Sequence, residues 1–274
     1  MSNMYVQALH IHPVKSVAGT APDEMAVEPW GLSGDRRWAL VDTEGTVITQ
    51  RQQPRLALAA ARPLGGGAVA LSAPGMAELA VEVPEPGPLE PVTLFGKKIE
   101  TVVAASAAAD WFSAYLGVPA RLVHMDDPAV RRPVDPQYAL PGETVSLADG
   151  YPVLLTTLAS LDALNSLIAQ GDHPEEGPLP MNRFRPNVVV AGAEAWAEDG
   201  WRLMAIGDAV FRGARECGRC IVTTTDQATA ERGKEPLKTL ARHRRIGKSL
   251  AFGRQLVPVR TGTVRVGDEV RVLE

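Results

Sequence analysis

The two cysteines of the chain lie three residues apart, in segment 216–220, which reads ECGRC. A pair at this spacing serves a metal, a redox couple, or a site that needs only one sulfur. A structural zinc ion takes four nitrogen or sulfur ligands, and nothing in the sequence joins His10 and His12 to the cysteines as a second pair. A thioredoxin-like couple opens a helix, whereas residues 221–225, IVTTT, predict a continuing strand. The zinc and redox interpretations are therefore disfavoured.

Two interpretations of the cysteine pair remain open. In the first, Cys220 alone acts as a thiolate that a metal can reach, and Arg219 directly before it is the stabilising cation. In the second, both cysteines are small buried hydrophobic residues. Basic residues elsewhere in the chain favour the first.

A second group of residues suited to chemistry is the segment 182–187, NRFRPN. Arg183 and Arg185 are two residues apart, which predicts side chains on one side of an extended segment leading into a buried strand at 188–190. Arg185 suits a two-pronged contact with a phosphate or carboxylate, and Asn187 suits the polar edge of a ring. The alternative is a pair of surface arginines where a strand begins.

Two further basic segments lie near the amino terminus. Lys15 and Ser16 follow a proline in the turn 13–16, and Arg36 and Arg37 precede a predicted hairpin. Each also has an ordinary interpretation, as a turn or as solvated charge beside a strand. A denser cluster at 242–248 predicts either a dock for an acidic partner protein or a solvated helix end.

Composition sets the class of protein. The 274 residues are 45% hydrophobic and 22% charged, which indicates a globular protein with a substantial core. A net charge of -4 and a pI near 5.8 argue against a nucleic-acid-binding surface. The sequence has no signal-like amino terminus and no apolar run approaching the roughly 18 residues of a membrane span, so we expect a cytoplasmic protein. It also lacks paired hydrolytic carboxylates, a phosphate-binding glycine loop and a nucleophile elbow.

The elements that must position these residues are mainly strands. Short runs that alternate with period 2, separated by 25 glycines and 22 prolines, predict a mainly β (α+β) fold. Hairpins are predicted at 37–49 and 92–103, and the Gly-Asp turns at 207–208 and 267–268 suit barrel corners. Three helices are expected, one capped by Ser106, one capped by Thr157 and one beginning at Glu235. The proline-rich segment 126–151 predicts a connection, which places a domain boundary near residue 125.

Six motifs occur in a fixed order along the chain: HIHPVKS, GDRRWALVD, ITQRQQPRLALA, NRFRPNVVV, CGRCIVTTTD and GKEPLKTLARHR. That order resembles the MOSC superfamily, named for the carboxy-terminal domain of molybdenum cofactor sulfurase, and within it the group of the mitochondrial amidoxime reducing component and its bacterial relatives. The resemblance covers almost the whole chain. It implies an amino-terminal β-barrel domain over residues 1–124, followed by a MOSC β-barrel domain with a few flanking helices over residues 125–274.

The resemblance also implies a site. The family holds the molybdenum cofactor, and the position that matches its metal-ligating cysteine is Cys220, while Cys217 is not expected to bind metal. Asp149 matches an aspartate near the metal, where it would take part in catalysis by relaying protons. The implied cofactor contacts come from both domains and are Lys15, Ser16, Arg36, Thr157, Arg185, Asn187, Arg219 and Cys220.

The activity that the resemblance implies is reduction of small N-oxygenated compounds, such as N-hydroxylated amidines, by oxygen-atom transfer. A separate electron donor of the ferredoxin, cytochrome or flavin reductase type is expected as a partner, because two cysteines cannot hold an iron–sulfur cluster that takes four. Gly218 departs from relatives that often carry a hydroxyl residue at this position. Two alternatives stay open: a non-catalytic carrier of molybdenum cofactor or its sulfur, and a barrel whose site has decayed.

Overall fold

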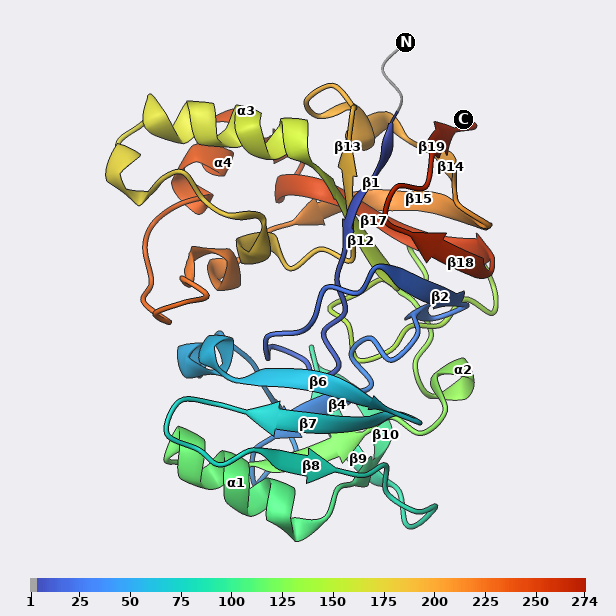
Figure 1. Cartoon of the computed structure of the whole chain (residues 1–274), viewed down its shortest axis with the longest axis vertical. Helices are drawn as coiled ribbons and strands as arrows, with labels where there is room; N and C mark the ends of the chain where they lie inside the picture. Colours follow the sequence, from blue (N-terminus) through green and yellow to red (C-terminus); the bar gives the residue numbers. More distant parts are fainter. Residues whose placement is uncertain (1–3) are drawn as a thin grey trace.

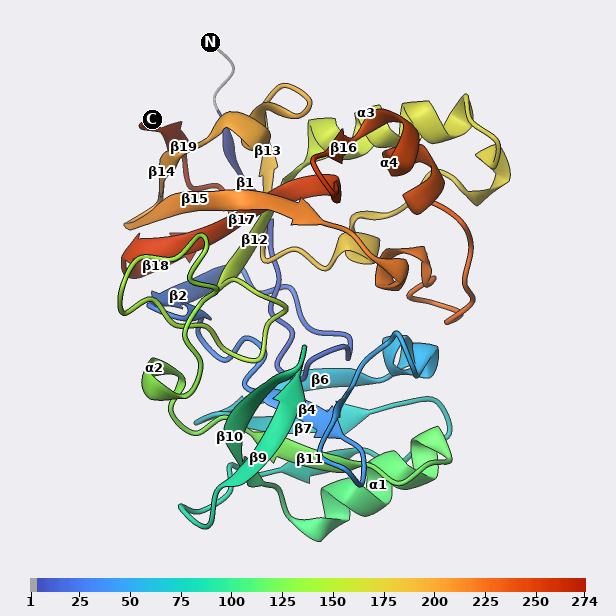
Figure 2. The same ribbon diagram turned by 180° about the vertical axis from the view of Figure 1, so that it is seen from behind.

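The structure, a computed structural model, describes residues 4–274 as two bodies stacked along the long axis of the molecule (Figure 1). The upper body in this view holds both ends of the described chain and the longest strands. The lower body holds the residues coloured from light blue to green. A view from behind shows the same division, with loops filling the region between the bodies (Figure 2).

The upper body is built on an eight-stranded sheet that nearly closes into a barrel. Its strands are β1 (Tyr5–Leu9), β12 (Val153–Thr157), β13 (Val188–Ala191), β14 (Leu203–Ile206), β15 (Ala209–Gly218), β16 (Arg245–Ile246), β17 (Ser249–Arg260) and β19 (Val270–Val272). Their spatial order is β1-β13-β12-β17-β15-β14-β19, with β16 paired to β17. A bridge between Tyr5 and Glu269 joins β1 to the turn before β19, which brings the two edges of the sheet together.

A three-stranded sheet lies beside the barrel in the order β18-β2-β3. It consists of β2 (Glu24–Glu28), β3 (Gly31–Leu32) and β18 (Gly262–Arg265). Val27 and Leu32 from this sheet pack into the same apolar core as Leu155, Phe211 and Leu256 from the barrel strands. Burial of these side chains therefore ties β2 and β3 to the carboxy-terminal half of the chain.

The lower body combines a five-stranded sheet, in the order β5-β4-β11-β10-β9, with a three-stranded sheet, in the order β6-β7-β8. Trp38 and Phe112 are fully buried between these sheets and the helix that covers them. The strands are β4 (Trp38–Val41), β5 (Val47–Ile48), β6 (Ala60–Gly65), β7 (Ala68–Ser72), β8 (Leu79–Val81), β9 (Glu90–Leu94), β10 (Lys97–Val103) and β11 (Arg121–His124).

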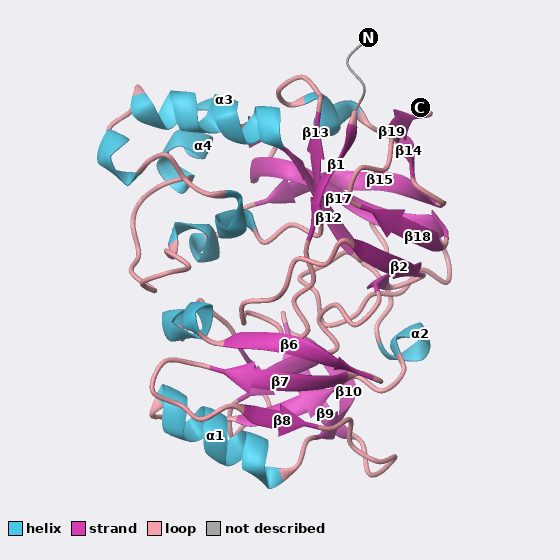
Figure 3. Cartoon of the chain, in the orientation of Figure 1, coloured by secondary structure: helices cyan, strands magenta, loops and turns pink. Residues whose placement is uncertain are grey.

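The α-helices flank the sheets rather than separating them (Figure 3). They are α1 (Ser106–Leu116), α2 (Pro128–Arg131), α3 (Leu158–Ala169) and α4 (Leu237–His243). Short 3-10 helices are η1 (Pro54–Leu58), η2 (Pro174–Glu176), η3 (Met181–Phe184), η4 (Ala197–Gly200) and η5 (Ile221–Thr224). Within residues 4–274, none of the helices is long and apolar enough to cross a membrane.

The predicted fold class is confirmed: strands dominate, a barrel is present, and the helices are few and peripheral. Both predicted hairpins form, as β4 with β5 and β9 with β10. The turn at 207–208 joins the paired strands β14 and β15. The domain boundary near residue 125 stays a prediction, and the structure adds that β1, β2 and β3 belong to the upper body.

The three predicted helices are present, but their beginnings differ from expectation in two cases. Thr157 caps α3, because its side chain accepts a hydrogen bond from the backbone N–H of Ser160. At α1 the N-cap position belongs to Ala105, and Ser106 is the first helical residue without a capping bond. The third helix begins at Leu237, two residues later than predicted, because Pro236 occupies its N-cap.

Two local predictions about the site segments are wrong. Residues 221–225 do not continue as a strand: Thr223 and Thr224 bond with their hydroxyls to the carbonyl oxygens of Cys220 and Ile221, which stabilises the 3-10 turn η5. Residues 183–185 are not extended either. Arg183 lies in η3, and Arg185 has the left-handed backbone that ends that turn, and their guanidinium groups bond to different segments, Arg183 to Asp226 and Arg185 to Val17.

We expect Thr157→Ala to lower the free energy of unfolding by about 1 kcal/mol, because it removes an N-cap bond from a buried helix end. This corresponds to a fall of roughly 2–4 °C in the melting temperature of a chain of this size. Ser106→Ala is the matched control, since that hydroxyl is exposed and caps nothing. Equal melting temperatures for the two variants would contradict the assignment of Thr157 as the cap.

Candidate functional site

One cavity draws its lining from segments far apart in the sequence. Four residues come from the first 51 positions, and the rest come from the connection around Asp149 and from the barrel. Together they place thiol, carboxylate, guanidinium and ammonium groups around one space. The lining residues are Lys15, Ser16, Arg36, Arg51, Ala148, Asp149, Gly150, Tyr151, Leu154, Arg183, Phe184, Arg185, Asn187, Cys217, Gly218, Arg219, Cys220, Val222, Thr223 and Gln255.

The structure brings eight of the nine predicted site residues to this cavity, and the exception is Thr157. The eight are Lys15, Ser16, Arg36, Asp149, Arg185, Asn187, Arg219 and Cys220. Arg183, which the sequence also singled out, lines the cavity and pairs with Asp226 at 2.8 Å.

Backbone carbonyl oxygens hold the first of these cations in place. Lys15 Nζ donates to the carbonyl oxygen of Leu147 at 2.9 Å, and Arg36 Nη2 donates to that of Arg185 at 3.1 Å. A carbonyl oxygen has only a partial charge, so it fixes the position of a cation without cancelling its charge. Each of the two also forms an ion pair, Arg36 with the buried Asp35 and Lys15 with Asp149.

The two arginines contributed by the barrel half are held in the same way. Arg185 Nη2 donates to the carbonyl oxygen of Val17 at 2.7 Å. Arg219 donates through Nε to Phe252 and through Nη2 to Phe184, at 3.0 and 3.2 Å to their carbonyl oxygens. The rings of these two phenylalanines lie 5.9 and 5.3 Å from the Arg219 guanidinium, within the range of cation–π attraction.

Unusual backbone conformations mark the same site. Ser16, Arg36 and Arg185 have φ angles of 67°, 48° and 51°, in the left-handed region that residues with side chains seldom adopt. Such conformations cost of order 1–3 kcal/mol each and gather at binding and catalytic sites. All three residues line the cavity. The strain therefore coincides with three of the residues that the sequence assigned to a ligand.

Burial and neighbouring cations disfavour the charged forms of two side chains of the cavity. Burial lowers the pKa of Lys15 to about 8, although the Asp149 carboxylate opposes this effect. Burial, reinforced by the charge of Arg36, lowers the pKa of Arg185 to about 9. Burial is the main cause of both shifts. The described lining itself carries more positive than negative charge: its carboxylate is Asp149, and its cations are Lys15, Arg36, Arg51, Arg183, Arg185 and Arg219. A bound anion would relieve that imbalance.

Asp149 is the one carboxylate that lines the cavity. Its side chain is 59% exposed and forms ion pairs with Lys15 and, at 3.6 Å, with Arg51. Partial desolvation raises the pKa of Asp149, but the charge and hydrogen bond of Lys15, with Arg51 and Arg36, outweigh this and hold the pKa well below its ordinary value. Asp149 therefore stays ionised near neutral pH, and Lys15 carries the proton of the pair. The expected relay needs both residues rather than Asp149 alone.

A buried arginine outside the cavity lining fixes the segment that bears Asp149. Arg132 donates through Nη1 to the carbonyl oxygens of Ser146 and Ala148, at 2.8 and 2.5 Å. It lies in the connection for which the sequence predicted no regular structure. Arg132 explains how an irregular segment presents a carboxylate at a defined place.

The two cysteines occupy different environments. Cys217 is only 6% exposed and accepts a hydrogen bond from Gln255 Nε2, with 3.1 Å between the atoms. Burial raises the pKa of the Cys217 thiol above its ordinary value. Cys220 is half-buried, and its sulfur accepts a hydrogen bond from Arg51 Nη2 at 3.2 Å. Cys220 is thus the accessible sulfur, and a cation stands beside it.

Arg51 is the residue that the sequence analysis missed. It was part of the motif ITQRQQPRLALA, but no role was assigned to it. In the structure its guanidinium lies between the Cys220 sulfur and the Asp149 carboxylate. The available signal was an arginine within a conspicuous polar run, Arg51-Gln52-Gln53, in an otherwise apolar neighbourhood. Nothing local to that run indicates contact with a residue 169 positions away.

A brace of hydrogen bonds from the barrel half holds the segment that contains Arg51. Arg232 Nη2 donates to the carbonyl oxygen of Arg51 at 2.9 Å and to that of Gln50. Gln227 and the fully buried Gln50 exchange side-chain hydrogen bonds at 3.2 Å. Gln50 also donates to the carbonyl oxygen of Ser16 at 2.8 Å. The brace therefore positions Arg51 and Ser16 together.

Two predicted cofactor contacts need correction. Thr157 does not line the cavity: it is fully buried, caps α3 and bonds to Ser160 and Glu198. Its hydroxyl is thus committed to the fold, and we withdraw it from the site. Asn187 lines the cavity, but its amide oxygen accepts from Arg36 at 3.1 Å and its amide nitrogen donates to the His10 carbonyl oxygen. Asn187 orients Arg36 rather than presenting a free amide.

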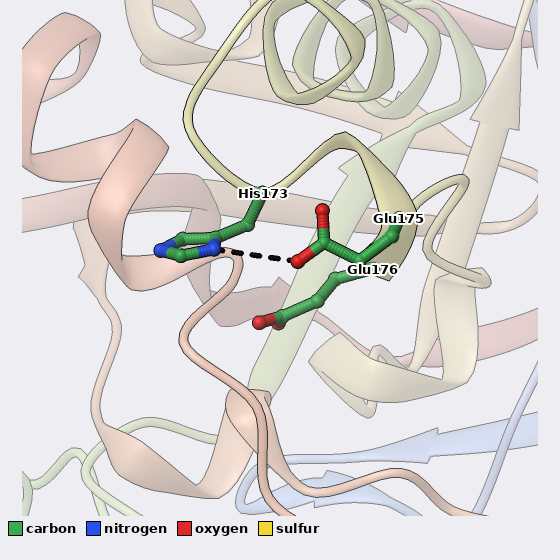
Figure 4. Close-up of side chains that lie close together, drawn as sticks. All are labelled: His173, Glu175 and Glu176. Atoms are coloured by element: carbon green, nitrogen blue, oxygen red, sulfur yellow. Dashed lines mark ion pairs between the residues drawn. The ribbon is translucent and has the colours of Figure 1, made fainter.

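A separate group of possible metal ligands lies on the turn after α3. His173, Glu175 and Glu176 approach one another there, and Nδ1 of His173 is 3.4 Å from Oε1 of Glu175 (Figure 4). Glu176 already accepts hydrogen bonds from the backbone N–H groups of Lys234 and Glu235, at 2.8 to 3.1 Å. These bonds make Glu176 a brace between two loops.

Comparison with known proteins agrees with this arrangement. The MOSC N-terminal beta barrel domain matches residues 3–119, and the MOSC domain matches residues 142–271. Human mitochondrial amidoxime-reducing component 1 is 34% identical, over 98% of this chain and 82% of that protein. The rat mitochondrial amidoxime reducing component 2 is 34% identical, over 97% and 82%. The molybdenum cofactor sulfurase of rice is 29% identical over 92% of this chain, which spans only 32% of that protein.

The chain is mainly β, with a nearly closed barrel and a cation-lined cavity beside one accessible cysteine. These features define its class of protein. The chain belongs to the MOSC domain family, with an amino-terminal MOSC barrel domain followed by the MOSC domain. The resemblance inferred from the ordered motifs is confirmed. Within the family, the chain is similar over nearly its full length to proteins named as amidoxime-reducing components.

We expect Lys15 in the cofactor-free protein to titrate near pH 8, losing its positive charge as the pH rises through that value. NMR of the lysine side-chain carbons measures this. Asp149→Asn should move the pKa of Lys15 further down, because the carboxylate raises it. Asp172→Asn, which removes an exposed carboxylate paired with Arg242, is the control and should leave Lys15 unchanged. A pKa of Lys15 that rises or stays fixed in Asp149→Asn would contradict the pairing.

Proposed function

We propose that this protein is a molybdenum-cofactor-dependent reductase of N-hydroxylated compounds. The observation that carries the proposal is the cavity itself, in which a predominantly cationic lining surrounds one accessible thiol. Human and rat relatives named as amidoxime-reducing components support the substrate class. The aligned length supports transfer of the proposal to the whole chain rather than to one domain.

The residues present fit such a cofactor. Its phosphate group needs separated cations, and its metal needs a thiolate. Carbonyl oxygens hold Arg185 and Arg219 without cancelling their charge, and Lys15 shares the single carboxylate of the lining, Asp149, with Arg51. A buried Cys217 beside a half-buried Cys220 leaves one sulfur for a metal.

We assign roles to the residues on this basis. Cys220 would be the protein's ligand to molybdenum, and Lys15, Ser16, Arg36, Arg185 and Arg219 would hold the anionic and polar parts of the cofactor. When bound, the cofactor supplies the metal that takes up the substrate's oxygen and exchanges electrons. Arg51 stabilises the Cys220 thiolate through its hydrogen bond to the sulfur. Asn187 keeps Arg36 in place.

The overall reaction breaks the N–O bond of the substrate and needs two electrons and two protons. An amidoxime then gives an amidine and one water. Asp149 and Lys15 lie in contact at the edge of the cavity, and they form a pair that can receive a proton from solvent and deliver it. Because the pKa of Asp149 is held well below its ordinary value, Lys15 is the member of the pair that carries and donates the proton, and Asp149 holds the Lys15 ammonium in place.

Electrons would come from a separate protein of the ferredoxin, cytochrome or flavin reductase type. The basic cluster at 242–248 remains the predicted dock, although two of its arginines are already paired. Arg242 pairs with Asp172 at 2.5 Å, and Arg244 pairs with Asp199 and stacks on Trp196. A donor would therefore meet mainly Arg245 and Lys248. The cytoplasmic location stays a prediction as well.

A carrier of molybdenum cofactor is the second candidate function. The alignment to the rice molybdenum cofactor sulfurase, over 92% of this chain, favours keeping it. A carrier binds the same cofactor through the same residues, so binding cannot separate the two candidates. Turnover can, because only the reductase consumes an N-hydroxylated substrate.

Metal analysis tests the assignment of the ligand. We expect protein purified from cells that make molybdenum cofactor to contain molybdenum, Cys220→Ser to lose it, and Cys217→Ser to keep it. Elemental analysis of the three proteins, normalised to protein concentration, gives the result. Loss of molybdenum in Cys217→Ser with retention in Cys220→Ser would overturn the assignment.

Turnover tests the activity. With reduced viologen as a chemical electron donor, the molybdenum-loaded protein should convert benzamidoxime to benzamidine, measured by chromatography. Cys220→Ser should fall to the level of viologen alone, while Cys217→Ser should stay within about a factor of ten of wild type, because its sulfur is not a ligand. A wild-type protein that holds molybdenum but reduces no amidoxime would favour the carrier.

A further inference from the structure

Phe95 stands at the turn between β9 and β10, and no role has been assigned to it above. The turn consists of Phe95 and Gly96, because Leu94 pairs with Lys97 across the hairpin. Phe95 is 54% exposed, an unusual position for a large aromatic side chain on the lower body. Its exposure is not a consequence of a disordered turn, since the flanking strands pair in regular register.

The backbone at Phe95 is strained. Its φ angle is 51°, and that of Gly96 is 76°, so both turn residues have left-handed conformations. Two-residue hairpin turns of this kind favour asparagine or glycine at the first position, and a bulky residue there is an outlier. In residues 4–274, three of the other non-glycine residues with positive φ line the cavity. Phe95 shares their strain and, as its contacts show, their neighbourhood.

The ring of Phe95 contacts two cations of the cavity. Its centroid lies 5.5 Å from Lys15 Nζ and 5.2 Å from the guanidinium carbon of Arg51. Arg51 in turn donates to the Cys220 sulfur at 3.2 Å. A single guanidinium therefore separates an exposed aromatic ring from the sulfur proposed to bind the metal. Phe95 is not itself one of the residues that line the cavity, but its ring lies against two that are, Lys15 and Arg51.

We propose that Phe95 determines substrate specificity by stacking on the flat ring of an aryl N-hydroxylated compound at the rim of the cavity. This inference rests on the proposed reductase function and narrows its substrate class to compounds with an aromatic ring beside the N–O group. The partly exposed ring offers surface for an aryl group, and Arg51 and Lys15 fix its orientation. An amidoxime group next to that aryl ring would then enter the cavity beside Asp149.

A purely structural role makes a different prediction. If Phe95 served only to hold Arg51 and Lys15 in place, its loss would disturb every substrate equally, because these cations act on the cofactor and the thiolate. If it contacts the substrate, only substrates with an aromatic ring lose affinity. The two roles differ in the ratio between aryl and alkyl substrates.

The experiment compares wild type, Phe95→Leu and Phe95→Trp with benzamidoxime and acetamidoxime under reduced viologen. Molybdenum content is measured for each protein. Phe95→Leu should raise the KM for benzamidoxime by about two- to tenfold, the range that one aromatic contact contributes, and leave acetamidoxime unchanged. Phe95→Trp should retain the preference for benzamidoxime, since it restores an aromatic face. Leucine and phenylalanine have the same backbone cost at this φ angle, so Phe95→Leu tests the loss of the aromatic ring.

Tyr5→Leu is the matched control, because Tyr5 is an aromatic residue on the barrel, 41% exposed, and its strand partners Ala191 and Glu269 do not line the cavity. It should change neither substrate. Equal changes for both substrates in Phe95→Leu, or no change for either, would overturn the proposal even when turnover by wild type confirms the reductase.

Calorimetry separates this proposal from the reductase proposal. Benzamidoxime and acetamidoxime are titrated into the oxidised, molybdenum-loaded proteins. If no protein turns over substrate, the reductase proposal fails, and weaker binding of benzamidoxime alone by Phe95→Leu would still support stacking. Unchanged binding of benzamidoxime by that variant overturns it.

Discussion

Main-chain carbonyl oxygens, rather than carboxylates, hold Arg185 and Arg219 in the cavity, and the anion-binding character of the site depends on this. Both arginines point their hydrogen-bond donors at main-chain oxygen atoms, whereas Lys15 donates to the carbonyl oxygen of Leu147 and also pairs with Asp149. A carboxylate in the same place would fix each side chain equally well, but it would also cancel the charge. The fold therefore buries positive charge in the cavity. Burial disfavours the charged forms of Lys15 and Arg185, and it lowers the pKa of both. A bound anion would stabilise the charged forms of these cations, and that stabilisation would contribute to its affinity.

Those carbonyl oxygens belong to segments with little regular structure, and tertiary contacts must make them rigid. Arg132 fixes the segment of Asp149, and Arg232 with Gln227 fixes the segment of Arg51. In both cases the bracing side chain lies outside the set of groups that would touch a ligand. The left-handed residues Ser16 and Arg36 show that backbone strain is accepted in the same place. Residues that would not touch a ligand therefore fix the positions of the residues that would.

The sequence predicted the parts of this site that short motifs encode. Cys220, Arg185 and Lys15 were found because each stands in a recognisable segment, and period-2 alternation was sufficient for the mainly β class. Arg51 and Phe95 were missed, because their importance arises from contacts with residues far away in the chain. No propensity or spacing rule reports such contacts.

The errors have a common physical origin as well. Residues 221–225 are rich in β-branched residues and therefore predict a strand, but their hydroxyls find carbonyl partners within the segment and close a 3-10 turn. Thr157 was assigned two roles, a helix cap and a cofactor contact. Only the cap survives, because a single buried hydroxyl that is fully hydrogen-bonded has nothing left to offer a ligand.

The lower body interrupts the barrel in sequence. Strand β1 pairs with β13, yet the chain leaves for the lower body before it supplies any further strand of that sheet. A fragment beginning at residue 125 would lack β1 and would expose the edge of β13, whose residues Val188–Ala191 are all buried in the intact chain. An open apolar edge of that kind promotes aggregation. Although sequence comparison divides the chain into two domains, a single cut between them leaves β1 in one fragment and its partner strand β13 in the other.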